Sequence, residues 1–377
     1  PTTLAVTRVV GLPRASQPFG VAFGPDGAAY VALEAAGRVV KLDRTTGGVI
    51  GSADVGPTPR HLSMTADGSR IFVSRFITPR LPGEYTAAVA TQSATGPAGG
   101  ELLVLDAATM AITSGLVLRH SDDPDSEVAG SGVPNYLGPA VISPDGTAAW
   151  VPSKKDNVKR GTLRSGFNLN FQNTVRAISS RVDLASASTS FGVQVDHDNA
   201  SLASTAAFDR YGVFLFVALE TSREVAVVDA HNLVEFFRIS VGRAPQGLAV
   251  SADGYSLYVN NFMDRTVGVY DLTKLVDEGQ WQVPLLATLQ SVASEKLAAN
   301  VLKGKQFFYD ARDTRLAREG YMSCASCHND GGHDGRVWDL TGLGEGLRST
   351  IALGGRRGGQ GFLHWSANFD EVQDFEG

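Results

Sequence analysis

Five stretches of similar sequence in the first three quarters of the chain constrain its fold most strongly. Each has an apolar alternating run, an Asp-centred turn, a second run, a short polar break and, where the repeat is complete, a third run that ends in Asp. The stretches are residues 18–43, 59–76, 138–153, 205–229 and 245–271. Alternation of apolar and polar residues predicts strands, and Asp-Gly favours a tight hairpin because Gly accepts a positive φ. The sequence therefore predicts a mainly β chain built from repeated antiparallel units.

The spacing of the turns indicates the kind of repeat. The turn aspartates are separated by 41, 78, 64 and 44 residues, and they are Asp26, Asp67, Asp145, Asp209 and Asp253. The short separations match a four-stranded blade of a β-propeller. Between the second and third turns we find strands for one blade only, with residues 101–107 as its third strand. The additional residues between these two turns, near 79–100 and 120–135, are predicted to form long loops on one face.

The repeats resemble the blades of the Tyr-Val-Thr-Asn β-propeller family, here at 30–33 (YVAL) and 258–261 (YVNN). The resemblance implies a multi-bladed propeller over residues 1–292. Five blades are visible, and seven are favoured for a full protein of which this chain would be a part. Residues 4–12 are expected to add an outer strand. Propellers serve many functions, so the resemblance is specific for fold alone.

The pattern changes to helical after residue 292. Residues 294–310 carry apolar side chains at helical spacing, and Ser294 is expected to cap the helix. We predict a second, small α-helical domain over 293–377 that is truncated at its C-terminus.

The only two cysteines of the chain lie in this region, in the run Cys324-Ala-Ser-Cys327-His328. Such a run typically attaches c-type haem, because two thiols bind the haem vinyl groups and the following imidazole binds the iron. A CxxC disulfide or redox pair needs no histidine and usually sits on a βαβ unit, which is absent here. A structural zinc needs four ligands, and only His328 and His333 are close by. The flanking sequence favours haem over a chance match.

Residues 303–336 (KGKQFFYDARDTRLAREGYMSCASCHNDGGHDGR) resemble the first haem segment of the bacterial dihaem cytochrome c peroxidase family, which includes related tryptophan-modifying dihaem enzymes. The segment 346–353 is similar to the family's Arg-Asn-x-Pro-Thr segment, with departures at Ser349 and Ile351. The resemblance implies that the domain over 293–377 is cytochrome c-like and carries one covalent haem c, and it allows a second haem beyond this chain. The family's second haem motif is missing from this chain, so the sequence does not decide whether the protein is an enzyme. If it is one, the resemblance implies a haem-dependent oxidoreductase of peroxidase type.

The distal iron ligand is predicted by elimination. All four methionines precede the motif, and His333 is too near His328 to reach the opposite face of a haem. His364 is therefore the expected ligand, with a deliberately open site as the alternative. The resemblance to the peroxidases gives Glu371 and Gln373 as catalytic candidates.

Other residues of this region are expected to surround the haem. Arg336 and Arg348 can pair with haem propionates, and Trp338 lies in the Gly-rich stretch after the motif. We expect these three side chains to contact the cofactor.

Charge and hydropathy exclude some partners. The net charge is -6 with dispersed Lys and Arg, which predicts no nucleic-acid partner, and no apolar run reaches the roughly 18 residues of a transmembrane span. Attachment of haem to thiols occurs outside the cytoplasm, so we expect a periplasmic, extracellular or cell-surface protein.

Three functions fit the sequence. In the first, the propeller docks a redox partner protein and the haem transfers single electrons. In the second, the chain belongs to a dihaem peroxidase-like oxidoreductase that acts on peroxide. In the third, the propeller binds a cell-surface component or forms a homo-oligomer, and the haem is accessory.

Overall fold

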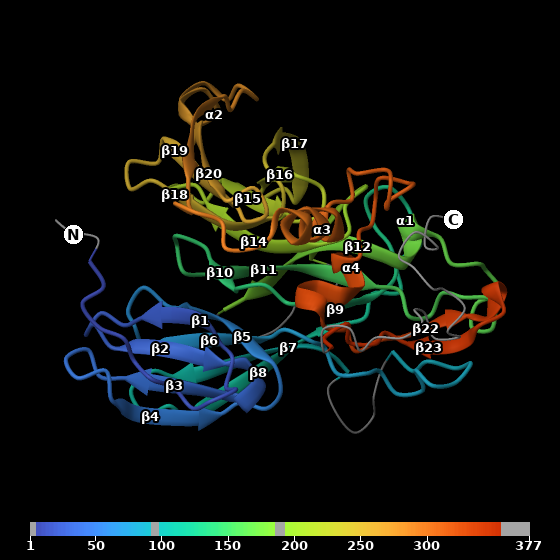
Figure 1. Cartoon of the computed structure of the whole chain (residues 1–377), viewed down its shortest axis with the longest axis horizontal. Helices are drawn as coiled ribbons and strands as arrows, with labels where there is room; N and C mark the ends of the chain where they lie inside the picture. Colours follow the sequence, from blue (N-terminus) through green and yellow to red (C-terminus); the bar gives the residue numbers. More distant parts are fainter. Residues whose placement is uncertain (1–4, 92–97, 185–192, 356–377) are drawn as a thin grey trace. The chain divides into compact units, whose positions relative to one another are not determined.

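The computed structural model describes residues 5–91, 98–184 and 193–355. They are mainly β and form five blade-like antiparallel sheets of a β-propeller, each from consecutive strands (Figure 1). The chain divides into two compact units: unit 1 comprises residues 1–76 and 101–116, and unit 2 comprises 77–100 and 117–377. The five sheets confirm the five predicted repeats.

The first two sheets belong mainly to unit 1. The first has the order β1 (Pro18–Phe23), β2 (Ala29–Leu33), β3 (Arg38–Leu42) and β4 (Val49–Asp54), with a short helical turn, η1 (Glu34–Ala36), after β2. The second has the order β5 (Pro59–Met64), β6 (Arg70–Arg75), β7 (Gly99–Asp106) and β8 (Ile112–Arg119). β1 contacts β5, so the first strands of the two sheets are neighbours, and Tyr30, Val39, Ile71 and Leu105 are buried between the sheets.

The other three sheets lie in unit 2. The third comprises β9 (Val133–Asn135), β10 (Val141–Ile142), β11 (Ala148–Asp156), β12 (Val175–Asp183) and β13 (Gln194–His197), and β9 pairs with the end of β11. The fourth comprises β14 (Ala203–Phe208), β15 (Phe214–Leu219), β16 (Glu224–Asp229) and β17 (Val234–Ser240). The fifth comprises β18 (Pro245–Val250), β19 (Ser256–Asn261), β20 (Thr266–Asp271) and β21 (Leu285–Gln290). β14 contacts β18, the first strand of the fifth sheet, and β11, the second strand on the main path of the third sheet.

Each sheet of unit 2 packs through the alternating faces of its strands. Leu215 and Val217 of β15 pack toward the third sheet with Trp150, whereas Phe216 packs toward the fifth sheet with Leu257. Alternate residues of a strand point to opposite faces, so one strand contributes to two cores. This is why β15 is apolar throughout and β16 is apolar between its two end residues.

Four of the five turn aspartates occupy equivalent positions in the hairpins between the first and second strands. In each, the carboxylate accepts a hydrogen bond from the amide two residues later, at 3.0–3.1 Å; the four donors are the amides of Ala28, Ser69, Thr147 and Tyr255. The following glycines, Gly27, Gly68, Gly146 and Gly254, all have positive φ. The predicted turns are therefore correct at Asp26, Asp67, Asp145 and Asp253.

Asp209 lies in the corresponding hairpin of the fourth sheet, but two positions before the site that the aspartate occupies in the other four hairpins. The positive-φ glycine here is Gly212, three residues after Asp209 rather than one. The Asp209 carboxylate accepts a hydrogen bond from Phe214 N at 2.8 Å, as the Ser251 hydroxyl does from Ser256 N at 2.9 Å in the next sheet. Asp209 thus replaces the Ser of the repeat, and our alignment at this residue was wrong by two positions.

The C-terminal segment of unit 2 is less helical than predicted. It contains α3 (Ala299–Tyr309), the single turn α4 (Ala325–His328), two short helical turns, η2 (Asn329–Gly331) and η3 (Thr341–Leu343), and a hairpin of β22 (Val337–Leu340) and β23 (Gly346–Ser349). Two other short helices, α1 (Phe171–Thr174) and α2 (Thr273–Glu278), lie between strands. Within the described residues, no helix is both long and apolar enough to cross a membrane.

The predicted start of one helix and one predicted strand were wrong. α3 begins at Ala299 and not at Ser294, because the Glu295 carboxylate binds the amides of Lys296 and Leu297 ahead of the helix. Residues 5–12 of the predicted outer strand form no strand. The boundary of the predicted domains at residue 292 stays a prediction, and both sides of it lie in unit 2.

Replacing glycine by alanine at two equivalent turns should separate backbone strain from crowding. Gly68 and Gly146 both have φ +71°, but an added Cβ would meet the Pro25 ring at Gly68 and open space at Gly146. We expect Gly146→Ala to lower the free energy of unfolding by about 1 kcal/mol, the cost of a left-handed alanine. Gly68→Ala should cost about 1–3 kcal/mol more because of overpacking. Urea denaturation measures both, and equal losses would contradict the predicted contact with Pro25.

Candidate functional site

One helical turn carries the cysteine and histidine residues of the predicted haem motif. α4 follows Cys324, and the amide of His328 donates to the Cys324 carbonyl at 2.9 Å. This hydrogen bond closes the turn, so the three residues lie together as predicted. Cys324 is exposed, whereas Cys327 and His328 are partly buried, and both cysteines are free thiols.

The His328 imidazole is held by the loop that follows it. Its Nδ1 lies 3.2 Å from the carbonyl oxygen of Gly332. A carbonyl only accepts hydrogen bonds, so this contact places the proton on Nδ1 and the lone pair on Nε2. Metal-bound histidines commonly use this arrangement, in which a carbonyl fixes the ring while the other nitrogen binds the metal.

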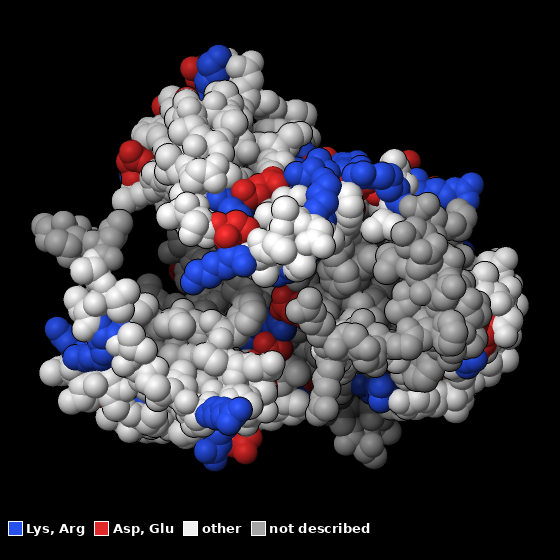
Figure 2. Space-filling view, viewed as in Figure 1, with Lys and Arg blue, Asp and Glu red and all other residues white. Residues whose placement is uncertain are grey.

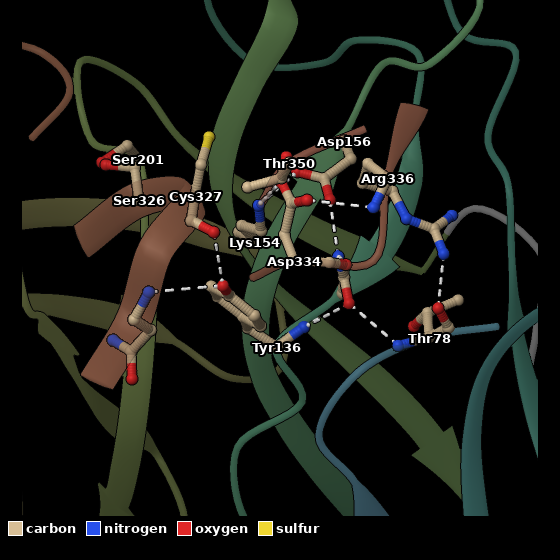
Figure 3. Close-up of polar contacts among 12 residues, drawn as sticks. Thr78, Tyr136, Lys154, Asp156, Ser201, Ser326, Cys327, Asp334, Arg336 and Thr350 are labelled. Carbon is tan, nitrogen blue, oxygen red and sulfur yellow. Dashed lines mark hydrogen bonds and ion pairs between the residues drawn. The ribbon is translucent and has the colours of Figure 1, made fainter. Parts of the chain in front are cut away.

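A buried tyrosine from the third sheet binds the motif turn. The Tyr136 hydroxyl donates to the Cys327 carbonyl at 2.7 Å and accepts from the amide of Asn329 at 3.3 Å (Figure 3). Tyr136 is fully buried, and burial raises the pKa of its phenol. Its φ of 51° is uncommon for a residue other than glycine. Such conformations persist where the surroundings impose them, and they cluster at functional sites.

A second contact binds the other face of the turn. The hydroxyls of Ser201 and Ser326 lie 2.7 Å apart, and Ser201 also lies 2.8 Å from the Thr221 hydroxyl. All three side chains are buried. The turn is therefore anchored to the third sheet through Tyr136 and to the region around the fourth sheet through Ser201 and Thr221.

A buried charge cluster lies beside Cys327. The Lys154 ammonium of β11 is 3.0 Å from Asp156 Oδ1 and 3.0 Å from Asp334 Oδ2, and it lies 4.6 Å from the centroid of the Tyr136 ring. The three charged side chains are inaccessible to solvent. Figure 3 shows them together beside the motif turn.

The two carboxylates of this cluster have different electrostatic surroundings. Burial raises the pKa of Asp156 to about 6, against the attraction of Lys154, and the nearby Asp334 charge adds to this effect. Burial would also raise the pKa of Asp334, but the Lys154 charge and hydrogen bonds lower it below its ordinary value. The proton of this pair is therefore held on Asp156 at mildly acidic pH.

Asn135 connects the cluster to two loops. Its amide nitrogen donates to Asp156 Oδ2 at 2.7 Å and to the Asp334 carbonyl at 2.8 Å, and its oxygen accepts from the amides of Thr78 and Tyr136 at 2.9 Å. Every hydrogen-bonding position of the side chain is used. The loop after the motif is therefore fixed to the edge of the third sheet.

The other predicted cofactor contacts are placed as follows. Arg336 is fully buried, and its guanidinium donates to Glu84 Oε1 at 2.6 Å and to the Thr78 carbonyl. Trp338 is buried, and its indole nitrogen donates to Thr350 Oγ1 at 3.1 Å. Arg348 is partly exposed and pairs with Glu345 at 3.4 Å. Their contact with haem stays a prediction, and His364, Glu371 and Gln373 lie outside the described residues.

Glu220 is a buried carboxylic acid on the other side of the turn. It accepts hydrogen bonds from Asn329 Nδ2 at 3.0 Å and from Gln246 Nε2 at 3.1 Å. Burial raises its pKa to about 7, and the nearby Asp330 charge acts in the same direction. Hydrogen bonds from Gln246 and Asn329 oppose this rise without supplying a full positive charge.

Sequence reasoning missed Tyr136, Lys154, Glu84 and Glu220. The only signal was the run Lys154-Lys155-Asp156 directly after the apolar residues of β11, since three consecutive charges within a strand place at least one of them toward the interior. Glu84 lies in the insertion near 79–100 that we predicted to be a loop on one face. In the structure it is buried with Leu81.

A second hydrogen-bonded set has the residue types of a hydrolase triad. The Ser179 hydroxyl is 3.0 Å from His197 Nε2, and His197 Nδ1 is 2.6 Å from Glu235 Oε2. Ser179 and His197 are completely buried, so a substrate cannot reach the hydroxyl. This set connects the third and fourth sheets and does not form a catalytic site.

The residue types of the motif turn match those that hold a covalent haem. Within residues 5–91, 98–184 and 193–355, no group of three or more His, Cys, Asp or Glu could hold a metal ion. The motif turn instead offers two free thiols and one oriented imidazole. This is the donor set that a c-type haem requires.

Comparisons with models of known families and with curated proteins give no match. Among solved structures, the β-propeller domain of Cps50 (Swd1) from Myceliophteria thermophila matches with 13% identity and a TM-score of 0.47, over 75% of this chain and 74% of that chain. A functionally unknown protein from Desulfotomaculum acetoxidans matches with 12% identity and a TM-score of 0.47, over 74% and 72%. The hydrazine synthase of Kuenenia stuttgartiensis matches with 14% identity and a TM-score of 0.33, over 71% and 99%. Similarities this distant transfer no function.

The buried acid gives a pH-dependent stability that can be measured. The Glu220 carboxyl keeps its proton to about pH 7 in the folded chain but loses it near 4.5 when unfolded. The unfolded state therefore binds fewer protons in this window, and the free energy of unfolding falls as pH rises through it. The Glu220→Gln variant has no carboxyl group to titrate, so its free energy of unfolding should not fall in this way. The difference in free energy of unfolding between the variant and the unmodified chain should therefore grow by about 2–3 kcal/mol from pH 4.5 to 7 and then stay constant.

Urea denaturation across this pH range tests the effect, with the exposed Glu319→Gln as the matched control. Parallel stability curves for Glu220→Gln and the unmodified chain would contradict a raised pKa at Glu220.

Proposed function

We propose that this chain is an extracytoplasmic redox protein that carries a c-type haem on Cys324 and Cys327, with His328 as the proximal ligand. The observation that carries the proposal is the single turn that presents two free thiols beside an imidazole whose Nδ1 is bound to the Gly332 carbonyl. When bound, haem supplies a one-electron redox centre. The location outside the cytoplasm follows from where haem is attached to thiols.

The chain's own residues hold the proximal turn. Tyr136 fixes the peptide between Cys327 and His328 through the Cys327 carbonyl, and Gly332 fixes the imidazole. Lys154 pairs with both Asp156 and Asp334 beside Cys327, so the positive charge next to the turn has fixed carboxylate partners. Charges that are already paired suit electron transfer, because little has to rearrange when an electron arrives or leaves.

We therefore favour electron transfer, with the propeller as the platform that docks a redox partner. Peroxide chemistry is the second candidate. It would need an open distal position and a nearby acid or amide, for which Glu371 and Gln373 are the candidates. A surface-binding propeller with an accessory haem is the third candidate, and no contact among the described residues favours it over the first.

Haem attachment tests the proposal directly. Expression with export and haem-attachment machinery should yield one c-type haem per chain in the pyridine haemochrome assay. Cys327→Ser should abolish stable two-thiol attachment, whereas Ser323→Ala, a change just outside the motif, should leave the stoichiometry unchanged. A chain that keeps free thiols and binds no haem would overturn the proposal.

The distal ligand separates electron transfer from peroxide chemistry. We expect His364 to complete a low-spin bis-histidine iron, so His364→Ala should give a high-spin absorption and EPR spectrum. His333→Ala is the matched control and should leave the spectrum unchanged. An unchanged spectrum for His364→Ala with altered reactivity toward peroxide would support the peroxidase-like function instead.

A further inference from the structure

The segment that leads into the motif is strongly basic in an acidic chain. Residues 296–318 contain six Lys or Arg and two Asp, whereas the whole chain has a net charge of -6. Figure 2 shows Lys and Arg side chains concentrated over α3 and the loop that follows it. The exposed members are Lys296, Lys303, Arg312, Arg315 and Arg318, with Lys305 partly exposed.

Carboxylates in and near the segment cancel only part of this charge. Asp310 is buried and pairs with Arg223 and with Arg243, the latter at 3.0 Å, so two further cations balance it. Asp313 pairs with Arg315, and Glu224 of β16 pairs with Arg312, both at 2.6 Å. Lys303 and Lys305 lie over the Phe307 and Phe262 rings at 4.6 and 5.6 Å. Their ammonium groups are therefore positioned by aromatic rings, and no carboxylate among the described residues forms an ion pair with either of them.

The basic segment packs directly against the motif turn. Tyr309 at the end of α3 lies in one buried cluster with Ala325 of α4. The Tyr309 hydroxyl donates to Asp330 Oδ1 at 2.9 Å, two residues after His328. The end of α3 therefore lies next to the proposed haem attachment site. We use the name basic face for the surface formed by the cations of this segment, which are Lys303, Lys305, Arg312, Arg315 and Arg318.

We propose that the basic face is the docking surface for an acidic redox protein that exchanges electrons with the haem. This inference rests on the proposed function. Complementary charge attracts such a partner over about a Debye length and raises the association rate, while short side-chain contacts keep the complex transient. The exchange moves one electron between the two redox centres, one of which is oxidised as the other is reduced, and no bond forms or breaks.

An acidic protein fits this surface better than a nucleic acid. Asp313 and Glu319 interrupt the Lys and Arg residues of the basic face along the sequence, so its cations do not form a continuous run. Nucleic-acid surfaces usually have continuous Lys and Arg clusters on a basic domain, whereas the net charge of this chain is -6.

Small redox reagents of opposite charge probe this face on the haem-loaded chain. The probes are ferricyanide, an anion, and tris(phenanthroline)cobalt(III), a cation. Each takes one electron from the reduced haem. At low salt, Lys303→Glu with Lys305→Glu should slow oxidation by ferricyanide about tenfold and accelerate oxidation by the cobalt complex, and added salt should remove both effects.

The matched control is Arg210→Glu with Lys274→Glu, which changes the net charge equally at exposed positions in the hairpin β14–β15 and in α2. Smaller changes for this pair would support a local effect of the basic face. A charge-neutral pair, Lys303→Gln with Lys305→Gln, should give an intermediate rate and guards against misfolding of the reversed pair.

The remaining outcomes distinguish failure of the docking inference from failure of the proposed haem function. Equal rates for the basic-face and control variants on a haem-loaded chain would overturn the docking inference alone. Loss of heparin binding without any change in the ferricyanide rate would indicate a polyanion-binding face and also overturn it. A chain that carries no haem would overturn the proposed function and this inference together.

Discussion

The buried hydroxyl of Tyr136 connects the motif turn to the propeller, and the arrangement of the site depends on it. It is the described partner of both the Cys327 carbonyl and the Asn329 amide, on either side of His328. A buried backbone group that loses its partner costs about 1–3 kcal/mol, so removal of the phenol would weaken the attachment of the turn by about this amount, although the Ser201–Ser326 contact would remain. The left-handed backbone of Tyr136 is maintained because Asn135 binds its amide and Lys154 packs on its ring.

The charge cluster beside Tyr136 gives the site specificity rather than stability. Moving Lys154, Asp156 and Asp334 out of water costs several kcal/mol per ion, and their mutual attraction does little more than offset that cost. The cluster fixes the pairing register of β11 relative to its neighbouring strands. Lys154 and Asp156 point to the same side of β11, where Asp334 must meet them, so a one-residue slip of this strand would bury both charges without partners. The position of the loop after the motif is thereby fixed relative to the third sheet.

Local patterns predicted the repeats and the motif turn, because both are encoded within a few residues. Alternation and Asp-Gly pairs located four turns correctly, and the fourth repeat failed at Asp209 because its glycine follows three residues later. The Cys-x-x-Cys-His spacing predicted one helical turn, which α4 forms. The anchors of the site were not predictable in this way. Tyr136 and Cys327 are 191 residues apart, and Arg336 and Glu84 are 252 apart, so no window of sequence contains both partners.

These long separations determine when the site can form during folding. Closing a loop of such length costs chain entropy before any contact compensates for it, so distant pairs form after the local hairpins. The third sheet must already exist before Tyr136 and Lys154 can bind the segment around Cys327. Until that last step the two thiols stay in an open, solvated segment. For the haem attachment proposed above, this order of folding leaves an interval in which an assembly enzyme can reach both sulfurs, and the interval ends when the segment docks.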